Sequence, residues 1–165
     1  MIACIRNYQE SDREQCRGLW LELTEWHRKI YGDSLIGGDH PEDHFDKHLS
    51  LVGKENLWVA CTKSKVVGLI GLIEKEYETE IEPIIVSKSY RHKGIGKQLV
   101  SWVIEEAQKK KLRHLNVSPV ARNKDTIAFF YKLGFVNLGY VELFIDFTGQ
   151  TWKPGFRIHD LDFDY

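Results

Sequence analysis

The sequence has no excess of charge of either sign and no block of like charges. Its 23 Lys and Arg residues nearly balance its 24 Asp and Glu residues, so the formal net charge is −1 at pH 7. A protein that attracts nucleic acid through its overall field carries a clear positive excess, which is lacking here. We therefore expect no nucleic-acid partner, and any anion site must be local.

Cysteine, leader and membrane signals are also sparse. The three cysteines, Cys4, Cys16 and Cys61, are odd in number and have neither metal-ligand nor redox spacing. The N-terminus shows no signal-peptide pattern. The longest apolar run, around residues 66–73, is less than half of the roughly 20 residues that a membrane span needs. These absences predict a reduced, cytoplasmic protein without a membrane segment.

The hydrophobic pattern predicts an α+β fold. With 165 residues, 42% of them hydrophobic, the chain suits a single domain over residues 1–165. Apolar residues at period two predict strands, and apolar residues at helical spacing predict helices. Strands are expected at 2–7, 57–62, 66–76, 80–86 and 114–117 and within 135–147, and helices at 11–31, 41–51, about 96–109 and 124–133. The order is βααβββαβαββ, a mixed, mostly antiparallel central sheet flanked by helices.

One loop joins an apolar strand to a helix and carries two glycines. It spans Arg91–Gly96 and follows a strand that ends near Val86. Glycines let backbone N–H groups converge on an anion at the positive end of a helix, and the loop adds three basic side chains. The alternative is a plain strand-to-helix turn. The dinucleotide fingerprint fails because Leu99 stands at its third glycine, and the Gly-Lys-Ser/Thr ending of a phosphate loop is missing.

These residues resemble the acetyl-CoA motif of the GNAT superfamily of N-acetyltransferases. That motif, Arg/Gln-x-x-Gly-x-Gly/Ala, begins five residues after a strand valine, as Arg91 follows Val86. The resemblance covers about residues 57–145, with the acetyl-CoA motifs within about 80–135. The acceptor-side elements are then about 8–52 and 136–165. The other matching residues are Glu80, Ile81, Glu82, Asn123, Ile127, Ala128, Leu133, Gly134 and Phe135.

The resemblance implies that acetyl-CoA is the cosubstrate and that the strands at 80–86 and 114–117 splay apart to admit it. Backbone groups of Ile84, Ile85 and Val86 would bind the pantetheine like an added strand. Pro83 independently favours a bulge, because proline cannot donate a ladder hydrogen bond. The remaining predicted cofactor residues are Arg91, His92, Lys93, Gly94, Ile95 and Gly96, which would hold the diphosphate, and Asn123.

Acyl transfer to an amine requires a base or a water relay, because an alkylamine with a pKa of about 10 is mostly protonated at neutral pH. Glu82 stands at a position that is often acidic in the family, so we expect it to be the catalytic base, with Glu80 as the second candidate. The alternative is that both are solvent-facing carboxylates.

The family often reprotonates the leaving thiolate with a tyrosine seven residues after the helix asparagine, where this chain has Phe130. Tyr131 lies one residue later, about 100° around a helix, and is the catalytic candidate that remains. Its alternative is an exposed helix tyrosine. Water or Tyr140 could also supply the proton.

Histidines recur every four residues in an acidic segment, at His40, His44 and His48, as metal ligands on a helix face would. A hydrophilic helix face, or an acidic surface that attracts a cationic amine, explains the same pattern. We expect no metal.

The expected function is therefore an N-acetyltransferase that moves an acetyl group from acetyl-CoA to a primary amine of a small molecule or peptide, by direct attack in a ternary complex. The alternative is a non-catalytic, CoA-binding regulatory protein, which Phe130 would suit. The apolar run at 140–147 and the aromatic tail also suggest a homodimer through the terminal strands.

Overall fold

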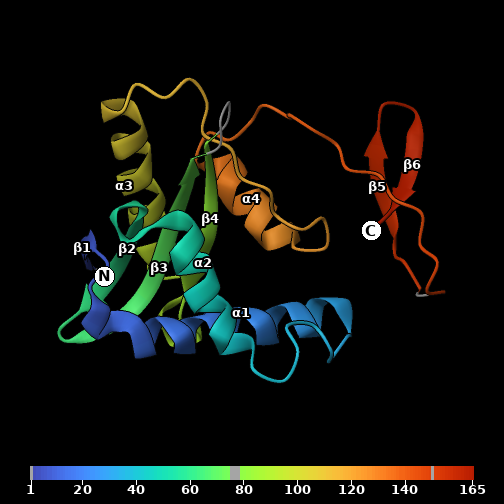
Figure 1. Ribbon diagram of the computed structural model, residues 1–165. Coiled ribbons are helices and arrows are strands. Elements are labelled where there is room, and N and C mark those ends of the chain that lie inside the picture. Colours follow the sequence, from blue (N-terminus) through green and yellow to red (C-terminus); the bar gives the residue numbers. More distant parts are fainter. Residues whose placement is uncertain (1, 75–78, 150) are drawn as a thin grey trace. The chain divides into compact units, whose positions relative to one another are not determined.

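A four-stranded antiparallel sheet forms the centre of the larger part of the protein (Figure 1). The computed structural model describes residues 2–74, 79–149 and 151–165. Its sheet has the order β1 (Cys4–Asn7), β2 (Leu57–Thr62), β3 (Lys65–Glu74) and β4 (Thr79–Val86). Lys75 and Glu76, which were expected to end the third strand, lie outside the described residues. Contacts divide the chain into two compact units, Met1–Ser118 and Pro119–Tyr165. The single domain over residues 1–165 stays a prediction.

One face of the sheet is covered by α1 (Arg13–Tyr31) and α2 (His44–Val52), which lie in front of it in Figure 1. Successive side chains of a strand point to opposite faces, and on this face they are every second residue, such as Leu57, Val59 and Leu69. They form one core with the helices, whose buried members are Cys16, Leu19 and Phe45. The expected helices at 11–31 and 41–51 are confirmed.

The opposite face is covered by α3 (Ile95–Lys109). Gly68 of β3 faces Leu99, to whose Cδ1 an added Cβ would lie at 3.0 Å. The buried residues of α3 recur at helical spacing and are Ile95, Leu99, Val100, Val103 and Ala107. Because both faces are covered, β2 and β3 are buried along most of their length. This explains their nearly continuous apolar sequences.

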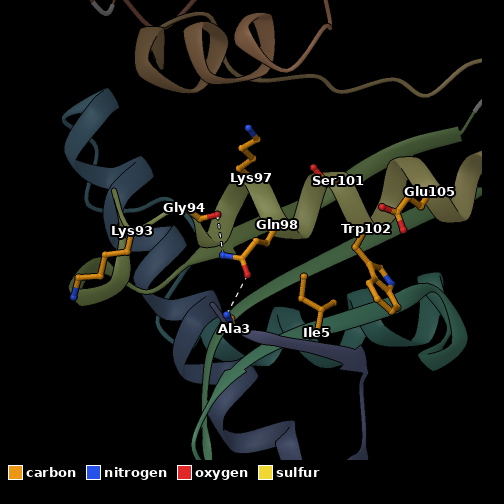
Figure 2. Close-up of a pocket in the computed structure, with 9 residues that line it drawn as sticks. All are labelled: Ala3, Ile5, Lys93, Gly94, Lys97, Gln98, Ser101, Trp102 and Glu105. Carbon is orange, nitrogen blue, oxygen red and sulfur yellow. Dashed lines mark hydrogen bonds between the residues drawn. The ribbon is translucent and has the colours of Figure 1, made fainter. Parts of the chain in front are cut away.

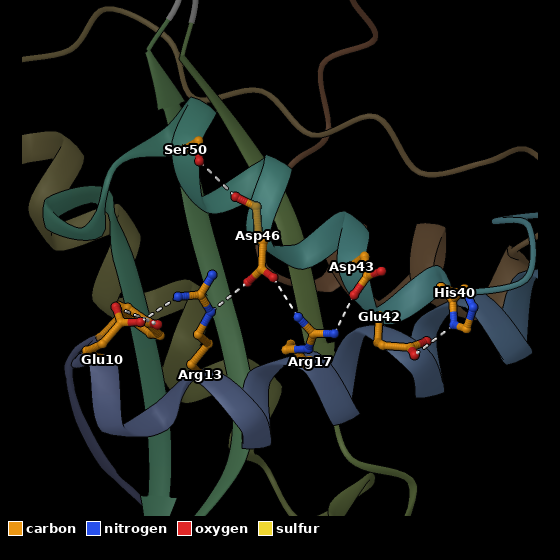
Figure 3. Close-up of polar contacts among 9 residues, drawn as sticks. Glu10, Arg13, Arg17, His40, Glu42, Asp43, Asp46 and Ser50 are labelled. Carbon is orange, nitrogen blue, oxygen red and sulfur yellow. Dashed lines mark hydrogen bonds and ion pairs between the residues drawn. The ribbon is translucent and has the colours of Figure 1, made fainter.

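Ion pairs join α1 to α2 (Figure 3). Arg17 pairs with Asp43, and its Nη1 lies 2.6 Å from Asp46 Oδ2. Arg13 Nε lies 3.0 Å from the other oxygen of Asp46. Each pair is partly exposed and contributes little alone, but the shared carboxylate makes them a network that fixes the position of α2 on α1.

The second unit consists of α4 (Lys124–Lys132) and a hairpin of β5 (Pro154–Ile158) and β6 (Leu161–Asp164). Two cation–π contacts join these elements: Arg122 lies 4.6 Å from the Trp152 ring centre and Lys124 lies 4.7 Å from that of Tyr165. The aromatic tail is thus a folded hairpin.

Two expected strand positions are corrected. Residues 135–147 form no strand, and their large apolar side chains are exposed, with Tyr140 at 89% and Phe147 at 90%. A strand needs a partner for its row of N–H and C=O groups, and no described segment pairs with this one. Residues 114–117 form only a bridge at Asn116, parallel to Glu80. The predicted class, α+β with an antiparallel sheet flanked by helices, is confirmed. Among the described residues, none of the helices has the length and apolar character needed to cross a bilayer.

Candidate active site

β4 contains an extra residue relative to β3. Ile84 pairs with Ile70 and Ile81 pairs with Leu72, so two residues of β4, Glu82 and Pro83, stand opposite the single residue Gly71. This is the bulge that Pro83 predicts. The Glu82–Pro83 peptide bond is cis.

The bulge fits only because Gly71 has no side chain. A Cβ at Gly71 would lie 2.4 Å from the carbonyl oxygen of Glu82 and 3.2 Å from Leu57 Cδ1. The same carbonyl oxygen lies 3.0 Å from Nε2 of His48 on α2. Because a carbonyl oxygen can only accept, His48 donates this hydrogen bond. The Glu82 carbonyl therefore lies close against Gly71 of β3 and accepts a hydrogen bond from α2.

Before the bulge, the outer edge of β4 is paired. Ile81 N–H donates to the carbonyl oxygen of Asn116 at 2.9 Å, and Asn116 N–H donates to that of Thr79 at 2.8 Å. In this part of β4, the backbone N–H and C=O groups of the odd-numbered residues therefore point away from β3. Beyond Ile81, no main-chain hydrogen bond from another strand reaches this edge within the described ranges. The expected splaying of residues 80–86 and 114–117 stays a prediction, with which this unpaired edge is compatible.

After the bulge, it is the even-numbered residues whose backbone N–H and C=O groups point away from β3. Ser87 N–H donates to the carbonyl oxygen of Val67 on β3 at 2.9 Å. Alternation along the strand then directs the N–H and C=O groups of Ile84 and Val86 away from β3. Without the extra residue, this edge would instead present Pro83, which has no N–H to offer. The bulge therefore creates an edge with donors and acceptors where the pantetheine was expected.

The loop after β4 presents unpaired backbone donors. The first hydrogen bond of α3 runs from Gln98 N–H to the carbonyl oxygen of Gly94 at 3.1 Å. The N–H groups of Ile95, Gly96 and Lys97 consequently have no partner within the helix. Gly94 has a φ of +81°, a left-handed conformation, and nothing lies within 4 Å of where its Cβ would be. Open space and a positive helix end suit a diphosphate.

Two basic side chains of the loop bond back to it. Arg91 Nε donates to the carbonyl oxygen of Val86 at 3.0 Å, and its guanidinium lies 5.2 Å from the Trp26 ring centre. Lys93 Nζ donates to the carbonyl oxygen of Ser89 at 2.7 Å. His92, with a φ of +59°, is exposed. Arg91 and Lys93 thus stabilise the loop while they add positive charge beside it.

Helix α1 holds the other end of the same loop. The Glu22 carboxylate accepts from Ser87 Oγ at 3.0 Å and from Lys88 N–H at 2.7 Å. Trp26, one turn further along α1, lies against Arg91. The predicted cofactor loop is therefore fixed by a helix that the sequence assigns to the acceptor side.

An open groove of about 530 Å³ lies beside the same loop (Figure 2). Gln98 lines it and joins the loop to the residue before β1, since its Oε1 accepts from Ala3 N–H at 3.1 Å and its Nε2 donates to the carbonyl oxygen of Gly94 at 3.3 Å. Lys93 and Lys97 are among its lining residues. The groove contains none of the predicted catalytic residues, so we assign it no chemical role.

The two candidate bases differ in environment. Glu80 is buried, at 8% exposure, and its backbone pairs with β3. Glu82 stands in the bulge with its side chain exposed, next to the outward-facing edge. Of the two side chains, only that of Glu82 is exposed.

The remaining predicted residues belong to the second unit. Asn123 caps α4, since its Oδ1 accepts from Thr126 N–H at 3.2 Å. Phe130 is 2% exposed and packs edge-on against Phe135, whereas the neighbouring Tyr131 is 64% exposed. Successive residues of a helix are about 100° apart around its axis, so Tyr131 points away from the direction in which Phe130 is buried.

The three histidines of the acidic segment have different surroundings. His40 is exposed and near Glu42, His44 is exposed, and His48 is buried against Trp20 and Glu82. The described ranges contain no group of three His, Cys, Asp or Glu side chains placed to hold a metal.

The sequence reasoning missed Gly71 and Glu22 and considered His48 only as a metal ligand or as part of a hydrophilic helix face. Two of these three residues carry a signal. A single glycine inside an apolar strand suggests a bulge or a close backbone approach. His48 falls at helical spacing with the buried Phe45 and Val52, so it is on the core face of its helix. Nothing local distinguishes Glu22 from other surface carboxylates.

Comparison with known proteins finds relatives among the N-acetyltransferases. An uncharacterized N-acetyltransferase of Methanocaldococcus jannaschii is 36% identical over 83 residues, which are 50% of this chain and 35% of that protein. Another, from the lysA 3' region of Bacillus methanolicus, is 56% identical over 36 residues, 21% of this chain and 30% of that one. This chain thus spans only about a third of the length of these curated relatives.

The PaiA N-acetyltransferase of Thermoplasma acidophilum, solved in complex with coenzyme A, has the same fold. Its TM-score is 0.68 at 21% identity, over 81% of this chain and 89% of that one. The model of the acetyltransferase (GNAT) family matches residues 20–135. That match covers well over half of the chain, including α1 from residue 20 onward, the bulged β4 and the glycine loop, and so this protein belongs to the acetyltransferase (GNAT) family.

Proposed function

We propose that this protein is an N-acetyltransferase that transfers an acetyl group from acetyl-CoA to a primary amine of a small molecule or peptide, by direct attack in a ternary complex. The observation that carries the proposal is the bulge at Glu82–Pro83. It turns the backbone groups of Ile84 and Val86 outward, directly before the left-handed loop at Gly94. One ligand that is extended at one end and carries a diphosphate at the other fits both features.

The residues of the chain have separate roles in this proposal. In the segment expected to bind the pantetheine arm, Ile84 and Val86 bind it with their outward backbone groups, while Ile85 pairs with Leu69 of β3. Arg91–Gly96 hold the diphosphate, with Asn123 as a further cofactor residue. The amine nitrogen attacks the thioester carbonyl carbon, the C–S bond breaks, and the products are an acetamide and the CoA thiolate. Glu82, exposed beside the edge, accepts the proton that the amine loses. The thiolate takes a proton from Tyr131 or from water.

The proposal predicts thiol release that depends on an amine. We expect acetyl-CoA to raise the melting temperature of the protein and free thiol to accumulate when an acceptor is added from a panel of amines, peptides and polyamines. A thiol-reactive dye measures the release, and the same panel without protein is the control. If neither CoA nor acetyl-CoA changes the melting temperature, the proposed function is wrong.

Phe130 supports a second candidate, a CoA-binding regulatory protein without catalysis. The family's usual general acid position is filled here by a phenyl ring that is 2% exposed and packed among other rings. Such a side chain cannot donate a proton. Stabilisation by acetyl-CoA with no thiol release across the whole panel would favour this candidate.

Replacing Glu82 with glutamine should lower turnover about tenfold at pH 6.5, because the amide cannot accept the amine proton. The deficit should shrink as the pH approaches about 10, where the acceptor amine arrives already neutral. The measurement is kcat against pH for wild type and Glu82→Gln. The matched control is Glu105→Gln on α3, where a glutamate lines the groove far along the helix from the loop. A pH profile of Glu82→Gln that coincides with that of wild type would remove Glu82 as the base.

Three further features belong to the proposal. The acceptor is bound by elements within about residues 8–52 and 136–165. The protein works in the cytoplasm, which its free thiols at Cys4, Cys16 and Cys61 suit. A homodimer forms through the C-terminal region, where the exposed apolar side chains at residues 138–147 would be covered.

A further inference from the structure

We propose that His48 is a positioning residue for acyl transfer: its Nε2–H fixes the carbonyl group of Glu82 and thereby holds the β4 bulge that directs the Ile84 and Val86 backbone outward. The inference rests on the proposed function, because the edge matters only if it binds the acyl donor. His48 touches neither reacting atom. It acts on them through one peptide group.

The contact joins two elements that are distant in sequence. His48 Nε2 lies 3.0 Å from the Glu82 carbonyl oxygen, across 34 positions of the chain. This carbonyl is in the bulge, where the antiparallel ladder with β3 is interrupted. A partly buried carbonyl that leaves the ladder needs another donor, and the histidine on α2 supplies it.

The ring of His48 is itself held in place. It is 7% exposed and lies against Trp20 of α1, with 5.0 Å between ring centres. Helix α2 is joined to α1 by the pairs of Arg13 and Arg17 with Asp46 (Figure 3). Burial lowers the pKa of His48, against the opposing effect of the Glu82 carbonyl. A neutral imidazole with its hydrogen on Nε2 still donates this bond.

Movement of this one carbonyl would change the edge that follows it. The parity of the outward-facing groups of Ile84 and Val86 depends on the single extra residue in β4. If the Glu82 peptide rotates to find a donor elsewhere, that extra residue is no longer fixed opposite Gly71. The donors and acceptors of the edge then lose their alignment with the glycine loop.

The test compares three variants with wild type in steady-state kinetics, well below their melting temperatures. His48→Leu removes the donor and keeps an apolar side chain, and we expect its kcat/KM for acetyl-CoA to fall about tenfold. His48→Gln restores a donor near the Nε2 position and should recover to within about threefold of wild type. His44→Leu makes the same change on an exposed face of α2, without a bond to the Glu82 carbonyl, and should keep the wild-type kcat/KM for acetyl-CoA.

A histidine that only packs the core would lower the melting temperature of His48→Leu and leave the kinetics of the folded protein unchanged, which would overturn the proposal. Failure of His48→Gln to recover would also overturn it. If His48→Leu does not fold, His48→Asn replaces it, because its shorter amide cannot reach the Glu82 oxygen, and equal activity of the Asn and Gln variants would contradict the inference. An inactive wild type that does not bind CoA would instead contradict the proposed function.

Discussion

Replacing Gly71 with alanine should destabilise the protein by about 3 kcal/mol and reduce acyl transfer more than 100-fold in the fraction that folds. The added Cβ would lie 2.4 Å from the carbonyl oxygen of Glu82, a distance that backbone atoms cannot accept without moving. The same Cβ would lie 3.2 Å from Leu57 Cδ1 on β2, which adds to the crowding. The bulge must therefore rearrange, and the edge at Ile84 and Val86 changes with it.

Denaturant unfolding measures the first part of this result and amine-dependent thiol release the second. Gly18→Ala is the matched control, because Gly18 is an exposed position inside α1 with nothing within 4 Å of its added Cβ. Alanine there should stabilise the helix by about 0.5–1 kcal/mol and leave activity unchanged. A Gly71→Ala protein with wild-type stability and turnover would show that the bulge is not required.

Gly94→Val should weaken binding of CoA about 30-fold. Gly94 has a φ of +81°. A β-branched residue in this left-handed conformation costs about 2 kcal/mol relative to glycine. Valine would drive this residue toward negative φ and so displace the N–H groups of Ile95 and Gly96 that begin α3. Isothermal titration with CoA measures the dissociation constant.

Gly94→Asn separates backbone strain from steric obstruction. Asparagine fills a similar volume but tolerates the left-handed conformation, and the space around the Cβ position is open. We expect its CoA affinity to stay within about threefold of wild type. If Asn and Val weaken binding equally, the loop is limited by space above Gly94, and the conformational explanation is wrong.

The parts of the fold that the sequence predicts well are those set by local pattern. The helices around Leu19, Phe45 and Leu99 and the hairpin of β2 and β3 follow from the spacing of residues that bury a shared core. The glycine loop was also predicted, since a strand, two glycines and a helix suffice to define it. Pro83 predicted the bulge, because the missing N–H of proline can be read from the sequence alone.

What the sequence does not reveal depends on tertiary contacts. Residues 135–147 have the composition of strands, but pairing requires a neighbour, which the described residues do not provide. The role of Glu22 requires knowing that α1 passes the end of β4, and the role of His48 requires the position of α2 over the bulge. Phe130 and Tyr131 were separated correctly by helical rotation alone, because that rotation is local.

The contacts of helix α1 with the loop after β4 constrain how the acceptor preference of this protein can evolve. Its Glu22 and Trp26 fix the loop from Ser87 to Arg91, while the same helix belongs to the region that we assign to the acceptor. Substitutions at Glu22 or Trp26 that are selected for a new amine would also alter the affinity for CoA. Laboratory evolution of acceptor preference should therefore vary the loop at residues 32–40 first and leave these two side chains intact.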